Sequence, residues 1–286
     1  MRAEGLTAIV PTFNEEANLG RCLASLAGWV PRTVVVDSGS TDSTEAVARA
    51  FGAEVVVHPF ETYTRQWIWA LDTLDLDGEW VLGLDADQVV TEALRDDILE
   101  RLAGAVPGVD GFYVLRRYVF RGRMLRYGGL YPKYMLKLFR RKAVVIDPGE
   151  LLDHHFYVRG GTARLCGELV EENRKESDLA FWVSKQARHA ALRAQEELAW
   201  RRSRVWPLRP VLFGTPDQRV LWHRRLWLRC PLYIRPFALF FYRYVLQRGF
   251  LDGTPGLVFH LGMALWFPLL VDLAIGEAQA IRRGGR

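Results

Sequence analysis

Strand-like and helix-like patterns alternate along the first 57 residues, and this alternation constrains the fold more than any other feature. Apolar runs at Leu6–Val10, Thr33–Asp37 and Glu54–Val57 have the length and the β-branched content of buried strands. Two stretches with helical spacing lie between them: Leu19, Cys22, Leu23 and Leu26, then Ala46, Val47, Ala50 and Phe51. Such βαβ units predict an α/β fold with a mainly parallel sheet and flanking helices.

A further apolar run, residues 79–88, ends on two carboxylates, Asp85 and Asp87, which flank Ala86. Ligands of open α/β sheets bind at the carboxyl ends of the strands. Because one small residue separates the two aspartates, both can approach a single hard cation. Mg²⁺ and Mn²⁺ prefer oxygen ligands and often share them with substrate phosphates. The alternative interpretation is an Asp-rich turn that caps the next helix.

Three segments together resemble glycosyltransferase family 2, whose members have the Rossmann-like GT-A fold: Val10–Glu15, Val36–Asp42 and Leu84–Asp87. The resemblance implies a nucleotide-sugar donor, a UDP- or GDP-sugar, and Mn²⁺ or Mg²⁺ as cofactor. It also implies that Asp87 holds the cation, with Asp85 as a further ligand. The nucleotide-sugar-binding residues that we expect are Pro11, Thr12, Phe13, Glu15, Asp37, Gln66, Asp85, Ala86 and Asp87.

The chemistry of the second segment agrees with that assignment. A carboxylate such as Asp37 at a strand end can accept a hydrogen bond from a base N–H or a sugar hydroxyl. The loop after it, residues 38–43, leads into a helix N-terminus, where backbone N–H groups favour anions or capping side chains. Plain helix capping is the alternative role for Ser40, Thr41 and Ser43.

A narrower resemblance, to bacterial lipopolysaccharide-core β-glucosyltransferases, rests on Phe60–Tyr63, Gln66, Gly128–Pro132 and Arg243–Gly253. It implies a lipid-linked acceptor in the synthesis of cell-envelope polysaccharide or lipopolysaccharide. These relatives usually carry a His-Glu pair after a Phe-Arg-Arg strand. The comparable place in this chain reads Leu152-Asp-His-His155, so the chain departs from the pattern where a catalytic base is expected.

An inverting transfer needs a general base that takes the proton of the acceptor hydroxyl. Asp153 and His154 are the catalytic candidates, and His154 can also complete the metal shell. The remaining candidates for the base are Glu168, Glu171 and Glu172.

Arginines cluster between two expected strands, Asp110–Leu115 and Tyr134–Phe139. Such side chains can hold an anionic acceptor, for instance a lipid phosphate, although a solvated basic face has the same composition. A helix is expected over Leu179–Arg201. The acceptor-binding residues that we expect are Arg123, Arg126, Tyr131 and Lys185.

The C-terminal third is basic and aromatic. Arg201 to Arg248 contains eleven arginines and one acid, with tryptophans interleaved. This composition favours an anionic membrane surface over nucleic acid, because an apolar stretch, Leu257–Ile275, follows. His260, Pro268 and Asp272 count against a simple span, so an interfacial or re-entrant helical hairpin is expected. An amphipathic helix packed on the catalytic domain is the alternative.

Together these features predict a catalytic GT-A domain over residues 1–200 and a membrane-interface region over residues 201–286. Within the first domain, residues 1–105 would bind the nucleotide-sugar and residues 106–200 the acceptor. Three widely spaced cysteines and no apolar leader at the N-terminus lead us to expect the cytoplasmic face of a bacterial inner membrane, with peripheral, monotopic or re-entrant attachment.

The predicted function is a metal-dependent inverting glycosyltransferase. A nucleotidyltransferase or a non-catalytic membrane-bound GT-A scaffold is the alternative.

Overall fold

The computed structural model describes residues 2–76, 78–104, 106–203 and 205–284. Arg204, one of the arginines of the basic stretch, lies outside these ranges. The chain forms two compact units. The first unit consists of Met1–Arg117, Lys133–Pro148 and Asp153–Arg174, and the second of Tyr118–Pro132, Gly149–Leu152 and Lys175–Arg286. Helix α5 (Leu179–Ser203) runs through residue 200 without a break, and the sequence-based division at residue 200 stays a prediction.

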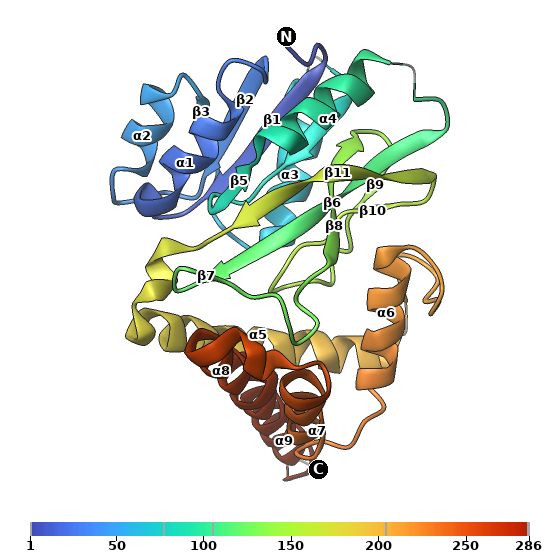
Figure 1. The fold of residues 1–286 in the computed structure, drawn as a ribbon. Helices are drawn as coiled ribbons and strands as arrows, with labels where there is room; N and C mark the ends of the chain where they lie inside the picture. Colours follow the sequence, from blue (N-terminus) through green and yellow to red (C-terminus); the bar gives the residue numbers. More distant parts are fainter. Residues whose placement is uncertain (1, 77, 105, 204, 285–286) are drawn as a thin grey trace. The chain divides into compact units, whose positions relative to one another are not determined.

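A nine-stranded sheet forms the framework, with strand order β3-β2-β1-β4-β8-β6-β11-β5 and β7 paired to β6 (Figure 1). Its strands are β1 (Leu6–Thr12), β2 (Arg32–Asp37), β3 (Glu54–Val57), β4 (Trp80–Gly83), β5 (Gln88–Val90), β6 (Val109–Phe120), β7 (Arg123–Met124), β8 (Lys133–Arg140) and β11 (Gly161–Glu171). A separate two-stranded sheet pairs β9 (Val144–Val145) with β10 (Tyr157–Val158).

The sheet is mixed, and the expectation of a mainly parallel sheet is wrong for one half of it. Strands β3, β2, β1 and β4 are parallel neighbours, as the βαβ alternation predicts. Beyond β4 the pairings of β8 with β4, of β8 with β6 and of β11 with β5 are antiparallel. Antiparallel neighbours such as β6 and β8 need no crossover helix between them. The antiparallel half of the sheet therefore lacks the alternation of strands and helices that is typical of parallel strands.

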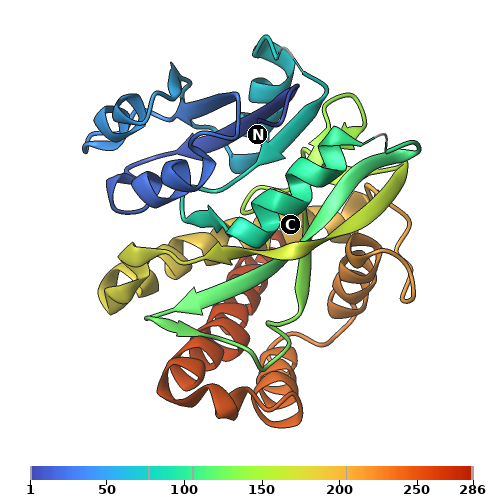
Figure 2. The same cartoon turned by 45° about the horizontal axis from the view of Figure 1, so that its top comes forward.

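Helices cover both faces of the parallel half because alternate strand residues point to opposite sides. In β1, Ala8 and Val10 belong to one buried apolar cluster and Ile9 to the other. The first cluster packs against α1 (Glu16–Leu26), α2 (Thr44–Ala50) and α4 (Glu92–Ala103), and Figure 2 shows α4 crossing in front of β6 and β11. The second cluster packs against α3 (Tyr63–Thr73). The prediction of an α/β fold with flanking helices is confirmed.

The second unit is mostly helical. Its helices are the 3₁₀ turn η1 (Arg174–Ser177), α5, α6 (Pro216–Trp227), α7 (Arg235–Phe240), the π-helical η2 (Phe241–Leu246), the 3₁₀ turn η3 (Gly249–Asp252), α8 (Gly253–His260), the π-helical η4 (Leu261–Trp266) and α9 (Phe267–Gly284). Small side chains let α5 and α9 approach closely, since Ala190 and Ala194 of α5 pack against Val271 and Ile275 of α9.

A buried charge network joins three helical segments of this unit. The Arg235 guanidinium at the start of α7 donates a 2.7 Å hydrogen bond to Glu197 Oε2 of α5 and a 2.8 Å bond to Asp272 Oδ1 of α9. The Trp227 indole donates to the other Glu197 oxygen at 2.9 Å. All three charged side chains are almost fully buried, and buried charges are tolerated when they are paired in this way.

The C-terminal apolar stretch is one continuous helical segment, so the expected helical hairpin is wrong, whereas its placement in a membrane interface stays a prediction. Pro268 occupies the second position of α9, directly after the π-helical turn η4, where the hydrogen-bond pattern already shifts and a missing N–H is accommodated. Gly249–Arg282 is the one helix of the described chain that is long and apolar enough to cross a membrane, by length and composition alone, and 44% of its most apolar window is buried. His260 and Asp272 point into the unit and are fully buried.

Candidate functional site

The Asp37 carboxylate organises the loop at the end of β2. Asp37 pairs with Thr12 of β1 in the sheet register, and its Oδ1 accepts a 2.9 Å hydrogen bond from the Thr12 hydroxyl. Its Oδ2 accepts from the backbone N–H groups of Gly39 and Ser40 at 3.0 and 2.8 Å. A single buried side chain therefore fixes the loop at the carboxyl ends of two neighbouring strands, where α/β proteins bind ligands.

The segment Pro11–Glu15 is attached to that loop. Asn14 has a positive φ of 54°, its side-chain Oδ1 accepts from Thr41 N at 2.8 Å, and its backbone N–H donates to Ser40 Oγ at 2.8 Å. The Glu15 N–H donates to Thr44 Oγ1 at 2.7 Å. Phe13 is left 55% exposed at the tip. The two loops form one rigid rim that presents an aromatic ring, which suits stacking on a base.

Gln66 of α3 joins the same rim. It is buried, its Nε2 donates to Ser38 Oγ at 3.2 Å, and its Oε1 lies 2.8 Å from His58 Nδ1. The His58 ring stacks on Trp69, with 4.1 Å between ring centroids. The structure thus brings together the residues expected at the nucleoside: Pro11, Thr12, Phe13, Glu15, Asp37 and Gln66.

The Asp85–Asp87 turn follows β4, next to β1 in the sheet. The Asp85 N–H donates to Gln88 Oε1 at 3.0 Å, and Asp87 accepts a 3.0 Å backbone hydrogen bond from Glu172. Ala86 between them is buried, while Asp85 and Asp87 are half-buried. Glu172, directly after the end of β11, therefore holds the turn that carries the two carboxylates.

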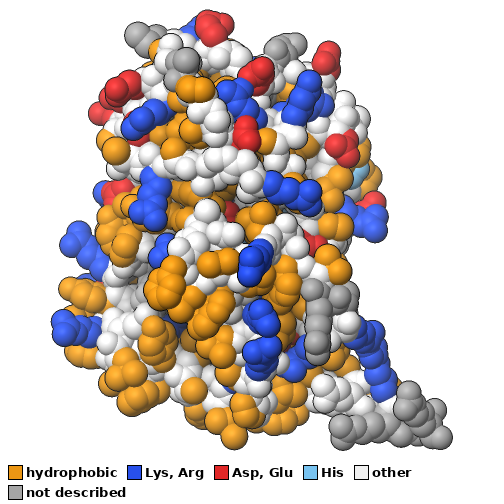
Figure 3. Space-filling model, turned by 90° about the vertical axis from the view of Figure 1, so that its right-hand side faces the viewer, with side chains coloured by type: hydrophobic (Ala, Val, Ile, Leu, Met, Phe, Trp, Pro, Cys, Tyr) orange, Lys and Arg blue, Asp and Glu red, His pale blue; other side chains and the backbone are white. Residues whose placement is uncertain are grey.

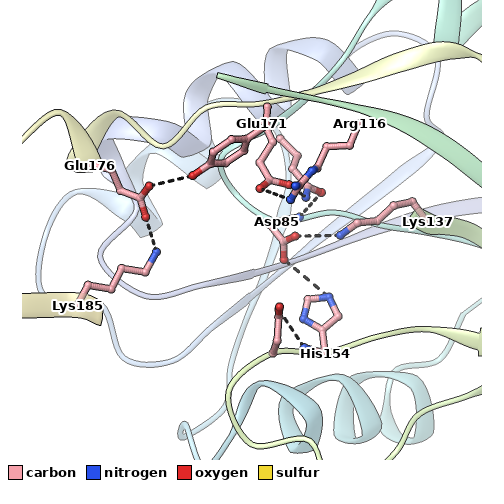
Figure 4. A network of polar contacts seen from close by, with 10 residues as sticks. Asp85, Arg116, Lys137, His154, Glu171, Glu176 and Lys185 are labelled. Carbon is pink, nitrogen blue, oxygen red and sulfur yellow. Dashed lines mark hydrogen bonds and ion pairs between the residues drawn. The ribbon is translucent and has the colours of Figure 1, made fainter. Parts of the chain in front are cut away.

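Asp85 has a partner that the sequence analysis did not identify. Lys137 Nζ on β8 donates a 2.9 Å hydrogen bond to Asp85 Oδ2, and His154 Nε2 lies 3.8 Å from Asp85 Oδ1 (Figure 4). Burial by itself raises the pKa of Asp85, but the Lys137 ammonium, through its charge and its hydrogen bond, outweighs burial and holds that pKa below its ordinary value. The available signal was a lone lysine within the apolar strand Tyr134–Phe139.

His154 lies in an aromatic pocket. Its ring is 5.2 Å from Trp67 and 5.0 Å from Phe156, centroid to centroid. Gly83 makes room for Phe156, because a Cβ at that position would lie 2.7 Å from the ring. Burial lowers the pKa of His154, so the imidazole is held neutral at pH 7. Asp153 is exposed, and its carboxylate accepts the His154 backbone N–H at 3.2 Å.

The three glutamates considered as alternative bases are all ion-paired. Glu171 Oε1 lies 3.1 Å from Arg116 Nη1, and Glu172 Oε2 lies 2.5 Å from Arg21 Nη1. Glu168 pairs with Arg117. An arginine therefore contacts one oxygen of each of these carboxylates, and Asp153 and His154 remain the catalytic candidates.

The donor set fits a cation that is only partly held by protein. Within the described ranges, no group of three or more His, Cys, Asp and Glu side chains is arranged to hold a metal ion. Asp85, Asp87 and His154 therefore do not form a closed shell. Magnesium-type ions are commonly held by one or two carboxylates while substrate phosphates and water supply the rest. The half-buried Asp87, at the same edge of the sheet as the rim, suits that role.

Comparison with known families decides the identity of this fold. The sequence model described as "Glycosyl transferase family 2" matches residues 7–163, more than half of the chain and nearly all of the first unit. The chain belongs to glycosyl transferase family 2. Its mixed sheet with flanking helices is accordingly a GT-A-like fold, and the matched range includes both loops of the rim, the Asp85–Asp87 turn, Lys137 and His154.

The chain is also similar to individual proteins and to a solved structure. An uncharacterized glycosyltransferase of Rickettsia felis is 38% identical over 95 residues, so the match spans about a third of that protein (33%). The lipopolysaccharide core biosynthesis glycosyltransferase LpsC of Rhizobium meliloti is 28% identical over 237 residues, which cover 79% of this chain and 84% of LpsC. A crystal structure of glucosyl-3-phosphoglycerate synthase from Mycobacterium tuberculosis has a TM-score of 0.42 and 19% identity, covering 67% of this chain and 79% of that one.

The acceptor residues expected of this family 2 chain lie in the second unit. The backbone N–H of Arg126 donates to Asp252 Oδ1 at 3.1 Å, and Arg123 Nη2 donates to the Leu251 carbonyl at 3.4 Å. Lys185 of α5 donates a 2.9 Å hydrogen bond to Glu176 Oε1, drawn in Figure 4. Tyr131 is half-buried beside the Leu130 core position. The structure thus groups Arg123 with Arg126 at the η3 turn, whereas Lys185 belongs to a separate pair with Glu176.

Proposed function

We propose that this protein transfers a sugar, with inversion, from a UDP- or GDP-sugar to a lipid-linked acceptor, with Mn²⁺ or Mg²⁺ as cofactor. The acceptor would be a lipopolysaccharide-core or other cell-envelope intermediate at the cytoplasmic face of a bacterial inner membrane. Membership in glycosyl transferase family 2 supports the reaction class. Similarity to LpsC over most of both chains supports a cell-envelope acceptor.

One observation carries the proposal. The Asp37 loop and the Asp85–Asp87 turn end two strands, β2 and β4, that both pair with β1 in the parallel half of the sheet. A rigid rim with an exposed aromatic ring therefore lies at the same sheet edge as two carboxylates. This arrangement suits a ligand with a base at one end and a diphosphate at the other.

Asp87 is the residue that would hold the cation together with the donor diphosphate. When bound, the cation would offset charge on the departing nucleoside diphosphate. Asp85, paired with Lys137, would accept a hydrogen bond from a donor hydroxyl. The Asp37 loop would position the nucleoside, since two of its backbone N–H groups, from Gly39 and Ser40, and the Ser40 hydroxyl donate to the Asp37 carboxylate.

Asp153 and His154 would supply the base. The acceptor hydroxyl attacks the anomeric carbon from the face opposite the leaving group, and its proton passes to the base in that step. The neutral imidazole of His154 can accept a proton at pH 7, and the exposed carboxylate of Asp153 can do so directly. Both groups belong to the segment that returns to Asp85 after β8.

A membrane location is supported by the surface of the second unit. Six large apolar side chains of the short segment 234–246 are exposed by 42–65%: Ile234, Phe237, Phe241, Tyr242, Val245 and Leu246. Figure 3 shows hydrophobic side chains, with Lys and Arg among them, gathered over the helices of this unit. Soluble monomers rarely expose such contiguous apolar patches, and neighbouring arginines match anionic headgroups.

A thermal-shift and turnover experiment tests the donor assignment. Nucleoside diphosphates and their sugars are screened with Mn²⁺, because a ligand bound only by the native state raises the melting temperature. Slow hydrolysis of one nucleotide-sugar, releasing the nucleoside diphosphate, is the expected result. In a parallel assay with a nucleoside triphosphate and a sugar phosphate, release of pyrophosphate would indicate a nucleotidyltransferase instead. The absence of both binding and turnover in all assays would indicate a non-catalytic scaffold.

A further inference from the structure

Lys137 is the most deeply buried cation near the proposed donor site. It lies on β8 between Leu136 and Leu138, and its residue surface is 1% exposed. Lysine is almost never fully buried unless it is paired, because removing an ammonium from water is costly. Its partner is Asp85, at 2.9 Å. The position therefore serves that carboxylate and is not explained by apolar packing.

The pairing changes what Asp85 can bind. One carboxylate oxygen accepts from the ammonium and the other faces His154 Nε2 at 3.8 Å, yet the side chain keeps 37% of its surface exposed. A divalent cation placed on Asp85 would lie within a few ångströms of a fixed positive charge, and like charges at that separation repel strongly in a partly buried site. A neutral hydroxyl group meets no such repulsion.

We propose that Lys137 is a positioning residue that reserves Asp85 for hydroxyl groups of the donor and leaves the cation to Asp87 and the donor diphosphate. This inference rests on the proposed function. It follows that the nucleotide-free protein binds Mn²⁺ weakly, and that the nucleoside diphosphate completes the metal site. The absence of a three-residue metal cluster from the described part of the chain agrees with a site that protein alone does not complete.

The decisive measurement is Mn²⁺ binding without nucleotide, followed by the electron paramagnetic resonance signal of the free ion. Lys137→Met removes the charge and keeps an unbranched side chain of similar length. Asp85 and Asp87 then both become available, and the affinity for Mn²⁺ should rise roughly tenfold. Lys137→Arg keeps the charge and should match the wild type. A purely structural role would lower the affinity or leave it unchanged, so a folded Lys137→Met protein without tighter binding overturns the proposal.

A second comparison decides the matter if Lys137→Met does not fold. With a saturating nucleoside diphosphate, Asp85→Asn should keep Mn²⁺ affinity within roughly twofold of wild type, whereas Asp87→Asn should lose at least tenfold. Equal losses in the two variants would show that both carboxylates bind the ion and would refute the role of Lys137.

The outcomes also separate this inference from the proposed function. If no nucleotide changes the melting temperature, the donor assignment fails. The nucleotide-free comparison of wild type with Lys137→Met still decides whether Lys137 keeps the cation away from Asp85.

Discussion

Gln88 and Glu171 face each other across the antiparallel β5–β11 pairing, and Gln88 Nε2 donates a 2.9 Å hydrogen bond to Glu171 Oε2. The other amide atom, Oε1, accepts the Asp85 N–H at 3.0 Å. Gln88 is fully buried. The Gln88 side chain therefore links β11 to the turn that carries the proposed donor and metal ligands.

We expect Gln88→Leu to lower the free energy of unfolding by about 1–3 kcal/mol, because it leaves the Asp85 N–H and a Glu171 carboxylate oxygen, both partly buried, without their Gln88 partner. The KM for the donor should rise as the turn loosens. Urea denaturation and initial rates measure the two effects. Gln218→Leu, which alters the cap of α6, is a matched control that should leave the donor KM unchanged. A Gln88→Leu enzyme with normal donor KM would contradict this role.

Asp87→Asn should keep the fold and lose most turnover, because an amide is a much poorer ligand for a hard cation than a carboxylate. The measurement is turnover over a range of Mn²⁺ concentrations, with circular dichroism to confirm folding. Near-wild-type turnover that is still abolished by EDTA would show that another residue holds the metal.

One of Asp153→Asn and His154→Ala should reduce turnover by roughly 10²-fold or more while nucleotide binding persists, the usual size of a general-base loss. Donor binding is followed by thermal shift and turnover by product release. If both variants are fully active, the base must be sought among Glu168, Glu171 and Glu172, despite their arginine partners.

The buried His154 predicts a specific pH dependence of stability. Its folded-state pKa lies below the ordinary value of 6.5 because of burial, so the unfolded chain takes up this proton first as the pH falls. The free energy of unfolding should therefore decrease as the pH drops below about 6.5. His154→Gln should flatten this slope, measured by urea denaturation in EDTA between about pH 5 and 7. Parallel slopes for the two proteins would contradict a buried neutral His154.

The second unit should bind vesicles that contain anionic lipid, and high salt should release it only in part. Each arginine near such a surface contributes about 1 kcal/mol that salt screens, whereas inserted aromatic side chains resist salt. Flotation at low and high salt measures both contributions.

The double variant Phe237→Ser/Phe241→Ser should lose the salt-resistant part of this binding. Phe51→Ser, at an aromatic residue of the first unit that is 47% exposed, is the control. A wild-type protein that stays monodisperse without detergent and fails to float with vesicles at low and at high salt would contradict membrane binding. That result would indicate a soluble acceptor.

Local side-chain patterns were enough to place most elements. The expected strand Glu54–Val57 has the same bounds as β3, and the expected helix Leu179–Arg201 differs from α5 by two residues at its end. These elements are defined by periodicity within the segment itself. The loops at Asp37 and at Asp85–Asp87 could likewise be predicted from the sequence, because they follow directly on apolar strands.

Contacts between residues far apart in the sequence could not be predicted from local patterns. Lys137 could equally have been an exposed residue of an edge strand, and it is buried because β8 pairs with β4 through Leu138 and Leu82, next to the end of β4. The same pairing makes the sheet mixed. The approach of His154 to Asp85 also depends on how the chain returns after β8, which no local pattern encodes. The continuous helix through Pro268 depends on a π-helical turn that composition does not reveal.

The buried network of Arg235, Glu197 and Asp272 means that α9 cannot be removed as if it were a detachable tail. A chain shortened before Asp272 would leave the Arg235 guanidinium with one carboxylate in place of two, and the Tyr233 N–H, which donates to Asp272 Oδ2 at 2.7 Å, without its acceptor. The proposed membrane association is therefore better tested by replacing exposed phenylalanines of the segment 234–246 than by truncation.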